Sequence, residues 1–219
     1  MRNKDCLYEK VCNNECSSTC IRYIQMNRLL ELSNLPKCFQ RPTLIYSTDN
    51  DHDAYVELAN IKNNIEDFVH NGKNLYICST TCGNAKTTWA TKLMLKYFDC
   101  IWPGSYDETK GLFVHVPSLL LDLKKFGNIP KYVSQIKEAD LVIWDDLAFN
   151  KLTEYEHEQL LQYIDYRLCS NKSNIYTSNL VTLDDLKSHV GGRLASRVYN
   201  GSTVITFTSP DFRVTLQNK

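Results

Sequence analysis

Short apolar segments alternate with amphipathic helical patterns from about residue 54 onward, and this alternation constrains the fold more than any other feature. The strand-like segments are NLYICS (74–79), GLFVHV (111–116), ADLVIWDDL (139–147), SNIYTSNL (173–180) and STVITFT (202–208). Helical patterns cover 54–72, 87–98, 117–127, 153–172, which opens with a Thr153–Glu156 capping-box pattern, and 182–199, which breaks at Gly191-Gly192. Strands separated by helices imply right-handed crossovers and a mostly parallel sheet that is covered on both faces. The sequence therefore predicts an α/β domain whose ligand site lies at the carboxyl ends of the strands.

The overall charge balance indicates no particular partner. Across 219 residues, 25 Lys and Arg balance 25 Asp and Glu, so no net field attracts nucleic acid or a membrane surface. No segment approaches the roughly 20 apolar residues of a membrane span, and the first residues, MRNKDCLYEK, lack the apolar core of a secretory signal. We therefore expect a cytoplasmic protein with no membrane partner, in which any DNA binding depends on a local patch or on assembly.

Residues 78–88, CSTTCGNAKTT, follow the first predicted strand and run into a helix, which is the context of a phosphate-binding loop. In that role backbone N–H groups hold phosphates, Lys86 reaches the β- and γ-phosphates, and the Thr87 hydroxyl binds Mg²⁺. Of the three glycines in the fuller motif only Gly83 is present. Ala85 is tolerable if its φ is near helical, and Thr80 is the harder replacement because the turn that leaves the strand often favours glycine. The candidate loop residues are Thr81, Cys82, Gly83, Asn84, Ala85, Lys86, Thr87 and Thr88; alone, the motif is equally consistent with a strand-to-helix turn that carries a surface lysine.

Polar residues at later strand ends strengthen this interpretation. Asp145 and Asp146 end an apolar strand, where Asp145 would hold Mg²⁺ and Asp146 would activate water. Asn179 ends the next strand, where an amide can orient the attacking water in the role called sensor 1, although Asn is also a common turn residue. The remaining cations are Arg193 and Arg197, which lie one helical turn apart and fit either an arginine finger or a surface pair, and Arg213, which could approach the phosphates.

Four cysteines gather near the N-terminus: Cys6, Cys12, Cys16 and Cys20. Four thiolates match a closed tetrahedral Zn²⁺ site, and a metal would stabilise a segment of this size that cannot bury a sufficient core. An iron–sulfur cluster and unliganded thiols are the alternatives. A second, weaker pattern interleaves Lys124, Lys125, Lys131 and Lys137 with Phe126 and Tyr132, as in single-strand DNA binders, although a solvated helix face explains it equally well.

Taken together, GNAKTTWATKLM, ADLVIWDDL, NIYTSNL and GGRLASRVYNGSTVITF resemble the DnaC-like family of AAA+ ATPases. These are replicative-helicase loaders of bacteria, phages and prophages, and the Gly-Asn-Ala-Lys-Thr form is similar to the bacteriophage branch. The resemblance divides the chain into a Cys-rich, zinc-binding helicase-interaction domain (1–40), a linker (41–54) and a P-loop AAA+ domain (55–219) without a C-terminal helical lid.

This resemblance also implies a function. It predicts an ATPase that binds ATP and Mg²⁺, assembles into a hexamer or spiral, and contacts single-stranded DNA and a hexameric replicative DNA helicase in the bacterial host cytoplasm. It assigns the Walker A motif to Gly83, Lys86, Thr87 and Thr88, Walker B to Asp145 and Asp146, sensor 1 to Asn179, the finger to Arg197 or Arg193, and a sensor-2 role to Arg213. The missing glycines and the shorter Asp146, in place of Glu, predict slow hydrolysis. A regulator of DNA transposition and a non-hydrolysing, ATP-switched assembly protein are the alternatives.

Overall fold

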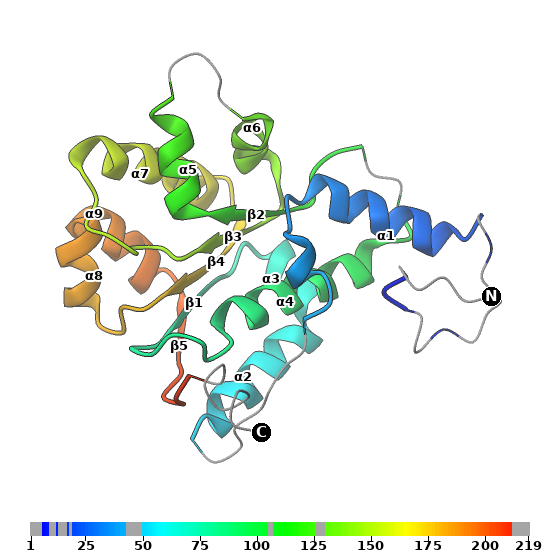
Figure 1. Ribbon diagram of the computed structural model, residues 1–219, viewed down its shortest axis with the longest axis horizontal. Helices are drawn as coiled ribbons and strands as arrows, with labels where there is room; N and C mark the ends of the chain where they lie inside the picture. Colours follow the sequence, from blue (N-terminus) through cyan, green and yellow to red (C-terminus); the bar gives the residue numbers. More distant parts are fainter. Residues whose placement is uncertain are drawn as a thin grey trace.

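The computed structural model describes residues 6–8, 12, 17, 19–42, 50–104, 107–125 and 130–211. Within these ranges, five β-strands form one sheet in the order β2-β3-β4-β1-β5 (Figure 1). Their bounds are Asn74–Cys78 (β1), Gly111–His115 (β2), Leu141–Asp145 (β3), Ser173–Ser178 (β4) and Thr203–Thr206 (β5). All neighbouring strands are parallel, so the predicted parallel α/β sheet is confirmed.

Helices cover both faces of the sheet, because successive strand side chains point to opposite sides. On one face Leu75 and Ile77 pack with Ile21–Leu32 (α1), His52–Asn63 (α2), Ile65–His70 (α3) and Lys86–Ile101 (α4). On the other face Tyr76, Trp144 and Tyr176 pack with Val116–Leu123 (α5), Lys131–Glu138 (α6), Glu154–Cys169 (α7), Leu183–Val190 (α8) and Gly192–Ala195 (α9). A 3₁₀ turn, Lys37–Phe39 (η1), and a π-helical turn, Ser196–Asn200 (η2), complete the described elements. None of the described helices is both long enough and apolar enough to span a membrane.

Local signals placed the start of α7 and the break between α8 and α9 correctly. Thr153 and Glu156 form the predicted capping box at the start of α7, and Gly191, with φ of 80°, separates α8 from α9 as predicted. The single helix predicted over 54–72 is wrong, because Asn64 leaves the helical region, with φ of −114° and ψ of 30°, and divides the segment into α2 and α3.

The described part of the N-terminal segment packs onto the sheet domain. Met26 and Leu29 of α1 belong to the same buried cluster as α4. The Phe113 N–H of the edge strand β2 donates to Ser33 O at 2.8 Å, and Asn34 Nδ2 donates to Phe113 O at 3.1 Å. These bonds cover one otherwise open strand edge. The domain division at 40 and 54 stays a prediction.

A second contact joins this segment to the far end of α4. Arg22 of α1 pairs with Asp99 at 2.5 Å, and the Tyr8 hydroxyl donates to the same carboxylate at 2.7 Å. The Arg22 guanidinium also lies over the Tyr8 ring, 3.6 Å from its centroid. The helix that begins at Lys86 is therefore held near its other end by N-terminal residues.

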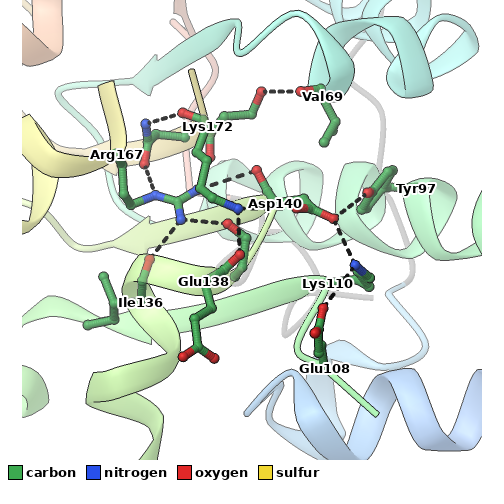
Figure 2. A network of polar contacts seen from close by, with 12 residues as sticks. Val69, Tyr97, Glu108, Lys110, Ile136, Glu138, Asp140, Arg167 and Lys172 are labelled. Carbon is green, nitrogen blue, oxygen red and sulfur yellow. Dashed lines mark hydrogen bonds and ion pairs between the residues drawn. The ribbon is translucent and has the colours of Figure 1, made fainter. Parts of the chain in front are cut away.

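Arg167 organises the sheet edge opposite the carboxyl ends of the strands (Figure 2). This fully buried side chain of α7 donates to Asn174 Oδ1 at 2.7 Å. It also donates to four backbone carbonyl oxygens, those of Ile136 at 2.7 Å, Ala139 at 2.7 Å, Ser173 at 2.5 Å and Asp140 at 3.4 Å. Burial lowers the pKa of Arg167 to about 10, so the side chain is still charged at neutral pH. One cation thus links α6, α7 and β4.

Candidate nucleotide-binding site

Residues 79–85 connect β1 to α4 at the carboxyl edge of the sheet. The loop has a left-handed backbone at Gly83, with φ of 71°, and at Ala85, with φ of 70°. The condition under which Ala85 is tolerable, a φ near the helical region, is therefore not met. Thr80 is not among the described residues with positive φ, so it is the easier of the two replacements. The left-handed residue at the position before the helix lets the chain wrap tightly around the first turn of α4.

Two buried polar side chains fill the interior of the loop. The Asn84 amide donates to Ser79 Oγ and, at 3.0 Å, to Thr81 Oγ1. Lys86 Nζ donates to Thr81 O at 2.9 Å and to Asn84 Oδ1 at 3.1 Å. Burial lowers the pKa of Lys86, and the negative charges around it, including Asp145 and Asp146, oppose that shift in part. A cation in this position can receive an anion in place of its two oxygen acceptors.

Thr87, Asp145 and Thr177 meet directly behind the loop. Thr87 Oγ1 donates to Asp145 Oδ1 at 2.7 Å, and Thr177 Oγ1 donates to the same oxygen at 2.8 Å. Strand β4 lies between β1 and β3, and this order brings Thr177 between the loop and Asp145. Burial raises the pKa of Asp145, although the two hydroxyl bonds lower it in part. A hydroxyl beside a buried carboxylate is the hard oxygen set that Mg²⁺ prefers, and a cation would offset the desolvation of the acid, so these residues fit the ion.

Asp146 stands at the rim of the site in a left-handed conformation, with φ of 56°. Its N–H donates to Thr177 Oγ1 at 3.1 Å, and its carboxylate Oδ2 lies 3.6 Å from His115 Nε2. The His115 Nδ1 atom shares a hydrogen bond of 2.8 Å with Ser118 Oγ, which orients the ring. The sequence reasoning missed His115, yet its position at the end of a predicted strand was a usable signal.

Asn179 also lies at the rim, beside the loop. Its amide donates to Cys82 Sγ at 3.8 Å, so the residue after β4 contacts the tip of the phosphate-loop segment. Thr88 follows Thr87 in the first turn of α4. The structure thus brings together six of the predicted residues from three strand ends: Lys86, Thr87, Asp145, Asp146, Asn179 and Cys82.

The predicted arginines are not gathered into this site. Arg197 pairs with Asp165 of α7. Arg193 is exposed on α9, and within the described residues it makes no hydrogen bond or ion pair with the loop. Arg213 lies outside the described residues.

The expected zinc site is only partly described. Cys16 lies outside the described ranges, and among the residues that are described no group of three or more His, Cys, Asp or Glu side chains could hold a metal. Cys6, Cys12 and Cys20 are free thiols. Zinc binding by these cysteines therefore stays a prediction.

Three lysines of the pattern of basic and aromatic residues between 124 and 137 are paired with other residues of the chain. Lys124 pairs with Glu156 at 2.8 Å, and Lys125 pairs with Asp122 at 2.8 Å. Lys137 Nζ lies 5.1 Å from the centroid of the Tyr166 ring. Phe126 lies outside the described residues. These pairings favour a solvated helix face over a preformed DNA groove.

Solved structures, but not sequence comparisons, show proteins similar to this chain. No protein-family model matches the chain, and no curated protein matches its sequence. Among solved structures, the DnaC helicase loader is 19% identical with a TM-score of 0.67, covering 79% of this chain and 100% of that one. DnaI is 21% identical with a TM-score of 0.65, covering 84% and 98%.

A third similar structure is the replication initiator DnaA bound to AMPPCP and single-stranded DNA. It is 16% identical with a TM-score of 0.59, and the match covers 84% of this chain and 56% of that one. At these low sequence identities, the structural similarity establishes the fold alone. The protein therefore has the same fold as the DnaC helicase loader and DnaI.

Proposed function

We propose that this protein is an ATP-dependent helicase loader, which binds a hexameric replicative DNA helicase and single-stranded DNA at the start of DNA replication. The observation that carries the proposal is the convergence of Lys86, Thr87 and Asp145 at one sheet edge. The fold shared with the DnaC helicase loader and DnaI supports the partner class.

In this proposal each residue of the site has one task. The N–H groups of the loop and Lys86 bind the phosphates of ATP, while Thr87 and Asp145 hold the accompanying Mg²⁺. The ion neutralises charge on the phosphates. Asp146 takes the proton of the attacking water, and Asn179 orients that water. His115, whose Nε2 lies 3.6 Å from Asp146 Oδ2, helps to orient that carboxylate. Hydrolysis is slow because Asp146 reaches less far than Glu and is fixed by a left-handed backbone.

Of the two candidates for the arginine finger, Arg193 fits the role better than Arg197. Arg197 is already paired with Asp165, so offering it to another subunit would break that ion pair. Arg193 is exposed on α9 and has no described partner to lose. In this proposal Arg193 stabilises transition-state charge on the nucleotide of the adjacent protomer. The Cys-rich segment, with zinc bound by Cys6, Cys12, Cys16 and Cys20, contacts the helicase.

The nucleotide part is tested by replacing Lys86. Lys86→Ala removes a buried cation from the phosphate site, so ATP affinity should fall by roughly a hundredfold. Titration of a fluorescent ATP analogue with Mg²⁺ measures the change. The matched control is Lys187→Ala, because Lys187 lies on α8 and pairs with the exposed Asp184, and its loss should leave the affinity for ATP unchanged. Equal affinity of wild type and Lys86→Ala would contradict the site.

The partner part is tested with the purified replicative helicase of the host. Size-exclusion chromatography with light scattering should detect a complex of the wild-type protein and the helicase in the presence of ATP. The Lys86→Ala variant should form a smaller amount of this complex. Absence of a complex both with and without ATP would overturn the loader proposal while leaving the nucleotide site intact. An ATP-dependent complex that releases no phosphate would identify a non-hydrolysing switch instead. Filaments on double-stranded DNA without helicase binding would identify the transposition-type function.

A further inference from the structure

The chain that follows β5 returns to the phosphate loop. We name residues 207–211, FTSPD, the C-terminal strap. The Phe207 N–H donates to Cys78 O at 2.8 Å, directly before the loop begins. Two residues later, Ser209 O accepts a bond of 2.8 Å from the Thr81 hydroxyl, inside the loop. The strap therefore follows the loop along its length and is bonded to it.

A buried acid fixes the middle of the strap. Asp51, which precedes α2 and is 3% exposed, accepts bonds from the N–H groups of Thr208 at 2.7 Å and Ser209 at 3.1 Å. The Thr208 hydroxyl donates to it at 2.8 Å. Burial raises the pKa of Asp51, but these hydrogen bonds outweigh that effect and its pKa is lowered. Asp51 is therefore charged at neutral pH and locks the strap turn against the loop.

The strap ends with a carboxylate against the loop. The Asp211 side chain lies so close to Gly83 that a Cβ added at Gly83 would overlap both carboxylate oxygens and the carbon between them. Gly83 thus serves two purposes: its φ of 71° suits glycine, and its bare Cα makes room for Asp211. Loops of this kind present N–H groups to phosphate, and the Asp211 carboxylate places an anion directly beside this loop at Gly83.

We propose that Asp211 is a built-in competitor for the nucleotide phosphates, held at the loop by the Asp51-bound strap. The inference rests on the proposed nucleotide site and deepens it. Binding of a triphosphate requires the Asp211 carboxylate to leave Gly83, because two anions in one cradle repel each other. Nucleotide affinity is then set partly by a residue outside the phosphate-loop motif, and nucleotide binding displaces the end of the strap.

The test is Asp211→Asn in the full chain, which removes the charge and keeps the shape. ATP affinity should increase by roughly tenfold, since relief of one close like-charge contact is of that order. Inorganic tripolyphosphate, used as a competitor, should gain by the same factor because the effect lies at the phosphates. Both gains should shrink at high salt. Asp211→Ala provides a second variant with the same expected direction.

Asp184→Asn is the matched control, because Asp184 is an exposed acid on α8 that pairs with Lys187. Unchanged or weaker ATP binding by Asp211→Asn, beside normal binding by wild type, would overturn this inference alone. A gain for ATP without a gain for tripolyphosphate would also overturn it, because Asp211 would then act on the nucleoside. Absence of nucleotide binding by wild type and both variants would overturn the proposed function as well.

Discussion

Two single residues stand where a phosphate loop normally has glycine, and their backbones differ. Ala85 is left-handed, with φ of 70°, a conformation in which a Cβ costs about 1–2 kcal/mol. Thr80 has no positive φ. We predict that Ala85→Gly raises the free energy of unfolding by about 0.5–1 kcal/mol, the strain relieved less the greater flexibility of glycine in the unfolded chain. Urea unfolding followed by tryptophan fluorescence measures the change.

Thr80→Gly is the matched comparison at this scale. It relieves no strain and adds flexibility to the unfolded chain, so it should lower the unfolding free energy by about 0.5–1 kcal/mol. Changes of the same sign in both variants would show that the backbone conformation at residue 85 does not govern the loop. The strained alanine is consistent with a loop whose shape is imposed by its buried hydrogen bonds, since Asn84 and Lys86 lie on either side of it.

At the scale of elements, Arg167 connects α6, α7 and β4 through bonds to buried carbonyl groups (Figure 2). Arg167→Met keeps much of the side-chain volume but leaves those carbonyls without donors. We predict a loss of about 3–5 kcal/mol in unfolding free energy, because each unsatisfied buried group costs about 1–3 kcal/mol. Urea unfolding again measures the loss.

Arg28→Met is the control for this substitution. Arg28 lies on α1 and pairs with Glu31 at 3.7 Å on an exposed surface, so the change should stay within about 0.5 kcal/mol. A loss below about 1 kcal/mol in Arg167→Met would mean that water reaches these carbonyls and that the network does not hold the elements together.

At the scale of the whole molecule, the question is whether the N-terminal segment is a separate unit. Leu29 of α1 is 1% exposed within the cluster that also contains Leu93 and Phe113. Leu29→Ala should therefore lower the stability of the entire sheet domain by about 3 kcal/mol. The measurement is urea unfolding followed by circular dichroism, in which one transition should move as a whole.

Ile21→Ala, on the same helix at 66% exposure, should leave the midpoint almost unchanged. Two unfolding transitions, of which Leu29→Ala moves only the first, would instead show that α1 belongs to an independent domain. The predicted division at residues 40 and 54 would then hold. A single shared transition would place α1 in the core of the sheet domain.

Much of the architecture could be predicted because it is encoded in short-range patterns. Alternating apolar strands and helical segments determined a parallel sheet, and the Thr153–Glu156 capping box determined the start of α7. Strand ends followed by Lys86, Asp145 and Asn179 indicated one site, since the carboxyl ends of parallel strands share an edge. The break at Asn64 was missed, because the helical spacing of apolar residues continues through it.

Only the tertiary structure decided which residues meet across the chain. The strand order brought Thr177 to Asp145 and His115 to Asp146. The return of the chain after β5 brought the Asp211 carboxylate to Gly83 of the loop. The physical reason is that helix and strand patterns act over a few residues, whereas strand order and chain return depend on packing between segments far apart in sequence.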